Sequence, residues 1–296
     1  MAFGMSEIKE LRERTGAGVL DCKNALTEND GNIEDAVDYL REKGMAAAAK
    51  RAGKVAAEGM VNTVISRDGN KGLIVEVNSE TDFVARNDNF KELVAKISQH
   101  LLESDAEDVD EALEESWFED DDKTLEIIIK EATANIGEKI ELRRFSRFNT
   151  DGILHSYIHM GGKIGVMVEL SGDADIETAN NIAMQIAASS PEYISPEEVT
   201  EEDIAREKKV YREQMLNEGK PEHIIDNIVE GKINKFYNQV CLNNQEYIRD
   251  TDISVEEYLD EKGVTVEDFV RYEVGEGIEK EEEDFAAEVQ AELNKK

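Results

Sequence analysis

The chain contains an internal repeat, and this repeat limits the folds that it can adopt. Residues 73–97 read LIVEVNSETDFVARNDNFKELVAKI, and residues 165–186 read GVMVELSGDADIETANNIAMQI. Each copy predicts the second strand of a β-hairpin followed by an amphipathic helix, because β-branched residues give way to apolar residues at helical spacing. A later strand follows each helix, at residues 139–148 and 266–277. The sequence therefore predicts a core of two β-β-α-β units with antiparallel sheets.

Three short helices are predicted in the first 44 residues. Ile8 and Leu11 mark the first helix, Val19 and Leu26 mark the second, and a third runs from residue 33 until Gly44 stops it. Helices of this size share one small core. The Ala-rich stretch MAAAAKRAGKVAA at 45–57 predicts a helical linker.

A helical hairpin interrupts the second unit. The seam of a short coiled coil is predicted by apolar residues that recur at three and four positions, namely Ile225, Val229, Ile233, Phe236 and Val240. We thus predict an α+β protein with six segments: a three-helix module (1–44), the linker (45–57), a first core subdomain (58–149), a second core subdomain (150–195 with 241–280), a coiled-coil arm (196–240) and a C-terminal amphipathic helix (281–296).

The charge balance argues against a nucleic-acid partner. The chain has 68 acidic and 34 basic residues, a formal charge of −34, and such a surface repels phosphate backbones. No run of 18 apolar residues and no secretory signal pattern occur, and Cys22 and Cys241 lie too far apart for a CxxC pair. We therefore expect a cytoplasmic protein without a membrane partner. The acidic residues 103–122 are expected to be solvated, with a short amphipathic turn at Trp117.

The sequence contains only weak matches to the motifs of metal, phosphate-binding and catalytic sites. His155 and His159 share one face of a strand, but a metal site needs a third ligand. The glycine-rich segment 160–165 precedes a strand, so it does not suit phosphate binding at a helix start. Neither cysteine has a neighbouring histidine that would activate it. We expect no catalytic, cofactor or metal site, and hence no enzyme.

Phe83 lies where the two copies of the repeat diverge most. The first copy has SETDFVARND between strand and helix, whereas the second has the ordinary turn GDADIET. Two interpretations of Phe83 remain open. In one, Thr81 caps a helix and Phe83 folds back onto its own core. In the other, an exposed Phe83 binds a partner. The same choice applies at Arg12, Val19 and Leu20, where we expect the apolar side chains in the core and Arg12 in solvent.

Four segments resemble the signature segments of bacterial elongation factor Ts. They read LRERTGAGVLDCKNALTENDGNIEDAV, VEVNSETDFVARND, SYIHMGGKIGVMVEL and FVRYEVGEGIEK, in the expected order and over nearly the whole chain. The resemblance implies a guanine-nucleotide exchange factor that binds elongation factor Tu, in its GDP-bound and nucleotide-free forms, and expels GDP. It also implies an N-terminal module like a ubiquitin-associated domain, a two-part core and a protruding arm.

The resemblance also implies roles for particular residues. Asp82 and Phe83 would insert between two helices of the partner's GTPase domain, and Thr81 to Val84 would dislodge the nucleotide-bound Mg²⁺. His159 would lie near the partner's other face. Arg12, Val19 and Leu20 would place the N-terminal module against the GTPase domain.

Two other functions stay open on the sequence alone. A non-catalytic adaptor would bridge proteins through the three-helix module and the arm, and Phe83 would then be dispensable. A small hydrolase would use the glycine-rich turn and a histidine, and would lose turnover when His159 is changed. Self-association through the arm is also left open, because apolar spacing does not distinguish it from a one-to-one complex.

Overall fold

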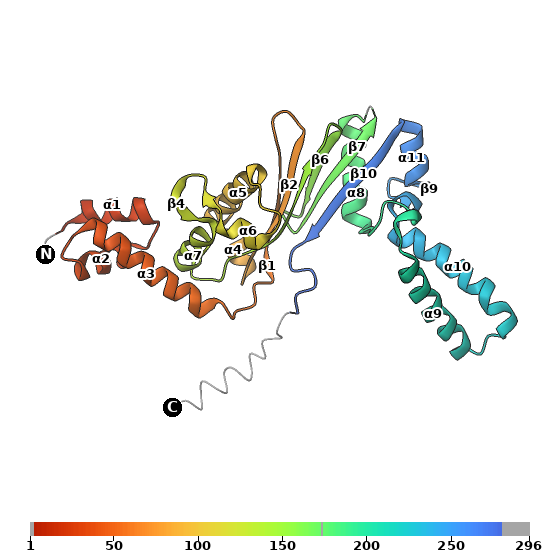
Figure 1. The fold of residues 1–296 in the computed structure, drawn as a ribbon, viewed down its shortest axis with the longest axis horizontal. Coiled ribbons are helices and arrows are strands. Elements are labelled where there is room, and N and C mark those ends of the chain that lie inside the picture. Colours follow the sequence, from red (N-terminus) through yellow and green to blue (C-terminus); the bar gives the residue numbers. More distant parts are fainter. Residues whose placement is uncertain (1–2, 173, 280–296) are drawn as a thin grey trace. The chain divides into compact units, whose positions relative to one another are not determined.

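The protein has the α+β composition with antiparallel sheets that the sequence predicts (Figure 1). The computed structural model describes residues 3–172 and 174–279. The chain divides into two compact units. One holds Met1–Val61, Val75–Phe145 and Glu273–Lys296, and the other holds Asn62–Ile74 and Ser146–Tyr272. The predicted C-terminal helix at 281–296 lies outside the described residues. No helix in the described part of the chain is both long and apolar enough to cross a membrane.

The N-terminal module consists of α1 (Met5–Thr15), α2 (Val19–Glu28) and α3 (Ile33–Arg51). Gly16 ends α1 in the left-handed region, and the Asn32 side chain caps α3 by accepting from two backbone N–H groups. The three helices share a core of small and medium apolar side chains: Ile8, Leu11, Ala17, Cys22, Ala25, Leu26 and Ala36. One face of each helix therefore supplies this core.

The predicted helix stop at Gly44 is wrong, because α3 continues to Arg51. Gly44 is buried where α3 packs on α7 (Leu125–Ile136), and a β-carbon on it would lie 3.2 Å from the Cβ of Ala134. The glycine thus allows two helices to approach closely, and its cost to helix propensity is offset by that packing. The segment expected as a separate linker begins as the last turns of α3.

The first sheet has the strand order β1-β2-β5, with β1 at Glu58–Ile65, β2 at Lys71–Ser79 and β5 at Glu141–Asn149. A turn at Asp68-Gly69 joins β1 to β2, and Gly69 there has a φ of 79°. After β2 come the single turn α4 (Asp82–Ala85) and the helix α5 (Asp88–Glu103). The amphipathic helix predicted after the strand is confirmed in α5: Phe90, Val94, Ile97 and Leu101 are buried, and Leu93 is half-buried.

A buried carboxylate fastens the segment after the last strand to the first unit. Glu76 of β2 accepts hydrogen bonds from Arg143 at 2.9 Å and from Arg144 at 2.6 Å. It also accepts the backbone N–H of Gly275 at 2.8 Å. Three donors surround a side chain with no exposed surface, so its charge is compensated.

The second sheet has the order β10-β7-β6, with β6 at Ile153–His159, β7 at Ile164–Gly172 and β10 at Val264–Glu273. β6 and β7 form an antiparallel hairpin. The helix α8 (Ile176–Ser189) packs on β6 and β7. Val166, Val168 and Leu170 face the same core as Ile182 and Ile186 of α8.

The repeat is longer than the predicted β-β-α-β pattern. A two-stranded hairpin and a helix precede the last strand of each copy: β3 (Ser116–Trp117), β4 (Asp120–Thr124) and α7 in the first, and β8 (Glu246–Tyr247), β9 (Asp250–Ser254) and α11 (Val255–Lys262) in the second. The register is the same in both. Trp117 pairs with Asp120 as Tyr247 pairs with Asp250. Thr124 and Ser254, the last residues of the hairpins, each cap the next helix.

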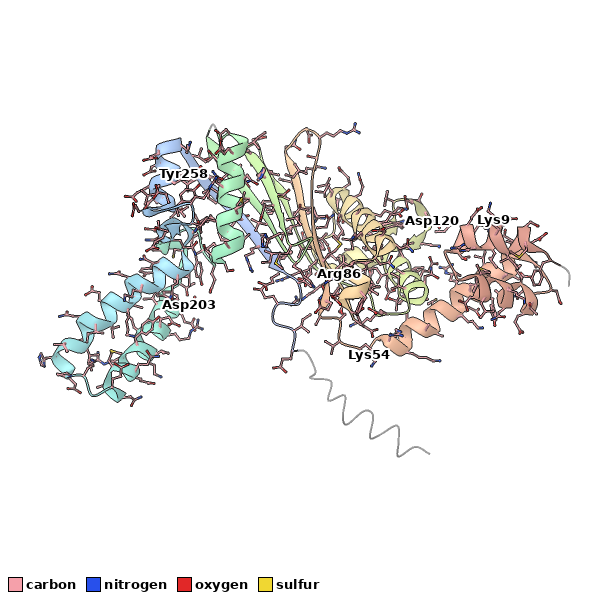
Figure 2. All side chains as sticks on the ribbon, turned by 180° about the vertical axis from the view of Figure 1, so that it is seen from behind. Lys9, Lys54, Arg86, Asp120, Asp203 and Tyr258 are labelled. Carbon is pink, nitrogen blue, oxygen red and sulfur yellow. The ribbon has the colours of Figure 1, made fainter. Side chains whose placement is uncertain are left out.

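The acidic side chains of the stretch 103–122 are mostly exposed, as expected, but the stretch also has secondary structure that was not predicted. It forms α6 (Val109–Glu114), capped by the Asp108 side chain, and then most of the first small hairpin. Trp117 is 3% exposed and its ring contacts the rings of Phe118 and His100, with centroids 4.7 and 5.1 Å away. The matching hairpin buries Tyr247, which stacks on Tyr258 (labelled in Figure 2). An aromatic residue therefore anchors each hairpin.

The arm is a helical hairpin of α9 (Glu201–Asn217) and α10 (Glu222–Val240), preceded by the short helix η1 (Pro196–Glu198) and followed by η2 (Leu242–Asn244). Its core holds Met215, Ile225, Val229 and Ile233. Three of the five predicted seam residues are thus buried, while Phe236 and Val240 are half-buried. Gly219 turns the chain between the helices with a φ of 75°.

Candidate functional site

The Thr81–Val84 segment forms one helical turn directly after β2. Thr81 is the N-cap of α4, and its hydroxyl accepts the backbone N–H of Val84 at 3.4 Å. Asp82 pairs with Arg86, one turn later, at 2.9 Å (Arg86 is labelled in Figure 2). Asn87 then caps the start of α5, so the single turn of α4 begins at one N-cap residue, Thr81, and ends just before another.

Phe83 does not fold back onto the core. Its side chain is 81% exposed, whereas Ala85, two residues later, is buried. The interpretation of Thr81 as a cap is correct, but the turn directs Ala85 inward and leaves the aromatic ring in solvent. An exposed ring of this size on an ordered turn is typical of a binding surface.

The loop between α7 and β5 forms hydrogen bonds with the start of the Thr81–Val84 turn. The carboxylate of Glu138 accepts the Thr81 backbone N–H at 2.9 Å and the Thr81 hydroxyl at 2.7 Å. In return, the carboxylate of Glu80 accepts the backbone N–H of Lys139 at 2.6 Å. We call Glu80, Thr81, Glu138 and Lys139 the reciprocal clasp. Arg51, the last residue of α3, donates to Glu80 at 2.8 Å and so joins the N-terminal module to it.

Sequence reasoning missed Glu138 and Arg51. Glu138 follows Gly137, which ends α7, and nothing in the local sequence says where its carboxylate points. The two loops of the clasp are more than fifty residues apart, so their contact depends on the tertiary fold.

Arg12, Val19 and Leu20 are all exposed on the N-terminal module. Val19 is 49% exposed and Leu20 is 67% exposed, so the expectation that these apolar side chains are core is wrong. They begin α2, whose inward face is supplied by Cys22, Ala25 and Leu26 instead. The expectation for Arg12, an exposed side chain, is correct.

His159 lies in the second unit, at the end of β6. It is exposed, and its Nδ1 is 3.0 Å from the hydroxyl of Tyr157 on the same strand. Met160 follows in the left-handed region with a φ of 48° and a side chain that is 73% exposed. His155 is different, because its Nε2 is buried without a hydrogen-bond partner. No cluster of metal-ligating side chains occurs among residues 3–172 and 174–279.

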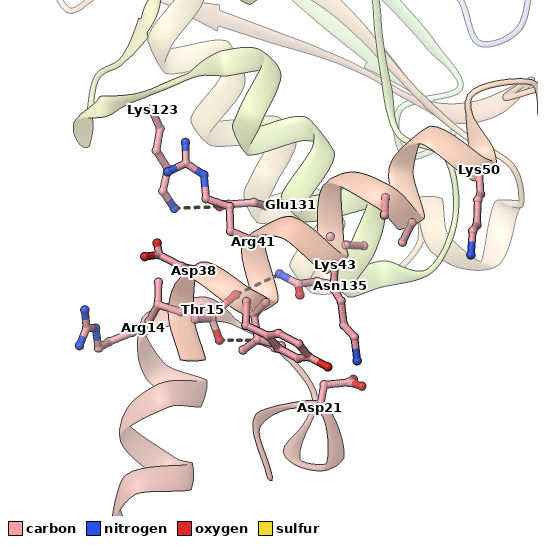
Figure 3. Close-up of a pocket in the computed structure, with 18 residues that line it drawn as sticks. Arg14, Thr15, Asp21, Asp38, Arg41, Lys43, Lys50, Lys123, Glu131 and Asn135 are labelled. Atoms are coloured by element: carbon pink, nitrogen blue, oxygen red, sulfur yellow. Dashed lines mark hydrogen bonds and ion pairs between the residues drawn. The ribbon is translucent and has the colours of Figure 1, made fainter. Parts of the chain in front are cut away.

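A cavity of 470 Å³ lies where the N-terminal module meets α7 (Figure 3). Several of its polar side chains are bonded within the first unit. Lys123 pairs with Glu131 at 2.9 Å, and the Asn135 amide donates to the Thr15 carbonyl at 3.1 Å. Lys43 lies over the Tyr39 ring at 4.5 Å. Of these contacts, the bond from Asn135 to Thr15 joins the N-terminal module to α7.

Both cysteines are buried within the two units. Burial raises the pKa of the Cys22 thiol, and it raises the pKa of Cys241 to about 11, with nearby glutamates adding to the effect. Nucleophilic cysteines need a lowered pKa, so neither thiol suits that chemistry.

Comparisons with known proteins identify the family of this chain. A family model described as Elongation factor TS matches residues 80–276, a region that includes the Thr81–Val84 turn and His159. A protein named elongation factor Ts from Halothermothrix orenii is 60% identical over 299 aligned positions, which cover all of both chains. The chain therefore belongs to the elongation factor Ts family, whose members are factors of translation elongation.

Proposed function

We propose that this chain is a guanine-nucleotide exchange factor for elongation factor Tu. In this proposal the Thr81–Val84 turn inserts Asp82 and Phe83 between two helices of the partner's GTPase domain and disturbs its Mg²⁺ site. The observation that carries the proposal is the 81% exposure of Phe83 on a turn held by the reciprocal clasp. Membership of the family supports the choice of partner.

The physical basis is a competition between the inserted turn and the nucleotide. A GTPase holds GDP partly through Mg²⁺, which bridges phosphate oxygens in a demanding octahedral site. A ligand that binds the partner with displaced helices weakens the metal and the nucleotide. By linkage, GDP must weaken the binding of that ligand by the same factor.

Phe83 alone does not supply enough free energy. Burial of one Phe side chain contributes about 1.5–3 kcal/mol, or one to two decades in an equilibrium constant. We therefore include a wide interface in the proposal. Arg12, Val19 and Leu20 would contact the GTPase domain from the N-terminal module, whose likeness to a ubiquitin-associated domain stays a prediction. His159 would contact another face of the partner.

The proposed activity needs no chemical step, no cofactor and no nucleic acid, and it would take place in the cytoplasm. The partner would be bound in both its GDP-bound and nucleotide-free forms. A complex of two exchange factors joined by α9 and α10 is compatible with this activity and is not required by it.

The proposal is tested by release of a fluorescent GDP analogue from elongation factor Tu. Substoichiometric amounts of the chain should accelerate release in a multiple-turnover manner, and added GDP should weaken the binding of the chain to its partner. An adaptor would bind elongation factor Tu without accelerating release. That result would overturn the exchange function and leave the adaptor as the better account.

A further inference from the structure

The Thr81–Val84 turn has little intrinsic stability. α4 is four residues long, and the hydrogen bonds of one helical turn do not offset the unfavourable free energy of helix nucleation. Its own cap is long, at 3.4 Å, and the Asp82–Arg86 pair is exposed to solvent, where ion pairs contribute little. Something outside the turn must therefore keep it folded with Phe83 in solvent.

Glu138 is placed to do this, because it binds two groups of Thr81 at once. A carboxylate only accepts hydrogen bonds, so the Thr81 hydroxyl must donate its single hydrogen to Glu138. The lone pairs of that hydroxyl are then left to accept the N–H of Val84, which is the capping bond of α4. Glu138 thus determines the orientation of the group that caps the turn.

We infer that Glu138 is a positioning residue, which orders the Thr81–Val84 turn before the partner arrives. This inference rests on the proposed exchange function. A turn that is already ordered does not lose conformational freedom when Phe83 is inserted, and preorganised groups bind more tightly for that reason. The two bonds of Glu138 go to Thr81, so in this inference it acts on exchange through the turn.

The variant Glu138→Gln tests the inference, since glutamine keeps the size of the side chain but has one acceptor oxygen and an NH₂ donor. One of the two Thr81 groups then loses its acceptor. Glu141→Gln is the matched control, because Glu141 is exposed and pairs with the Lys139 side chain at 2.7 Å. Both variants remove one negative charge from the same region.

Two readouts separate positioning from a general structural role. The first is GDP release, measured for Glu138→Gln with Phe83 present and in a Phe83→Ala background. We expect release to slow by roughly fivefold to tenfold with Phe83 present, the factor for one lost hydrogen bond. In the Phe83→Ala background the same change should have little effect, because coupled residues are not additive. Glu141→Gln should resemble the native protein.

The second readout is amide hydrogen exchange of the isolated chain over residues 80–90, which does not depend on elongation factor Tu. Glu138→Gln should lower protection there and leave α8 unchanged. The inference is overturned if protection stays native, or if release slows by the same factor in both backgrounds. If the native chain fails to accelerate release, the exchange function is overturned, and hydrogen exchange alone decides whether Glu138 orders the turn.

Discussion

Gly44 of α3 and Ala134 of α7 lie so close that a β-carbon on Gly44 would be 3.2 Å from the Cβ of Ala134. This contact lies where the N-terminal module packs on the rest of the first unit. Gly44→Leu should therefore lower the free energy of unfolding by about 1–3 kcal/mol, the usual cost of overpacking. Urea denaturation of the native protein and of Gly44→Leu measures this difference in the free energy of unfolding.

Gly231 supplies the control for this prediction. It lies within α10, and apart from its chain neighbours and the backbone of its own helix no atom is within 4 Å of where its Cβ would stand. Gly231→Ala should raise the free energy of unfolding by roughly 0.5–1 kcal/mol through helix propensity alone. An unchanged stability in Gly44→Leu would mean that α3 and α7 do not pack closely in solution.

Glu76 should be among the most costly carboxylates to remove. It has no exposed surface, and its removal would take one acceptor away from Arg143, from Arg144 and from the Gly275 backbone N–H. Glu76→Ala should lower the free energy of unfolding by roughly 3–5 kcal/mol, as for other broken buried pairs. The midpoint of thermal or urea unfolding measures this loss.

A surface pair serves as the comparison. Glu126 pairs with Lys130 at 2.7 Å across one exposed turn of α7, and Glu126→Gln should cost at most about 1 kcal/mol. If Glu76→Ala were no more harmful than Glu126→Gln, the buried network would not contribute as its geometry indicates.

His100 should make the protein less stable in acid. Burial lowers the pKa of His100, an effect that the Glu115 carboxylate, 3.5 Å away, partly opposes. The folded state thus binds the proton less readily than the unfolded state, whose histidine pKa is about 6.5. The neutral form contributes its full stability above that pH, and this contribution is lost as the pH falls toward the lowered folded-state pKa.

The variant His100→Phe isolates this effect, because the ring packs against Trp117 and Phe118 and its Nε2 makes no hydrogen bond. We expect the native protein to lose more unfolding free energy than the variant between about pH 8 and pH 5. Urea titrations at each pH, followed by the fluorescence of Trp117, give the comparison. Equal pH dependence in the two proteins would contradict the assignment.

The parts of the fold that follow local patterns could be predicted from the sequence. The β-branched residues within 72–78 and the helical spacing from Phe90 to Leu101 are each patterns of neighbours within a few residues. Gly44 misled the prediction, because a glycine that ends a helix and a glycine that allows a close helix contact look the same in sequence. The small hairpin at 116–124 was not predicted, because its run of acidic residues is unlike a typical strand. These residues face solvent while Trp117 anchors the hairpin.

The candidate site was only partly predictable. Thr81 as a cap is a local feature, and Phe83 was recognisable because the second copy of the repeat lacks it. The bonds from Glu138 to Thr81 join segments that only tertiary packing brings together, so no spacing rule could indicate them. Val19 and Leu20 were assigned inward because apolar type alone does not say which face of a short helix is buried.

The central claim is that Phe83 is inserted into elongation factor Tu to release GDP. The most direct measurement compares Phe83→Ala with Ile176→Ala in the release of a fluorescent GDP analogue. Ile176 is 80% exposed at the strand–helix connection of the second copy, so it matches Phe83 in exposure and in place within the repeat.

We predict that Phe83→Ala slows accelerated release by roughly one to two decades, the equivalent of one buried Phe. Ile176→Ala should stay within about twofold of the native rate, as for an ordinary surface substitution. Equal acceleration by the native chain and by Phe83→Ala would contradict the account, because the exposed ring would then play no part in the exchange.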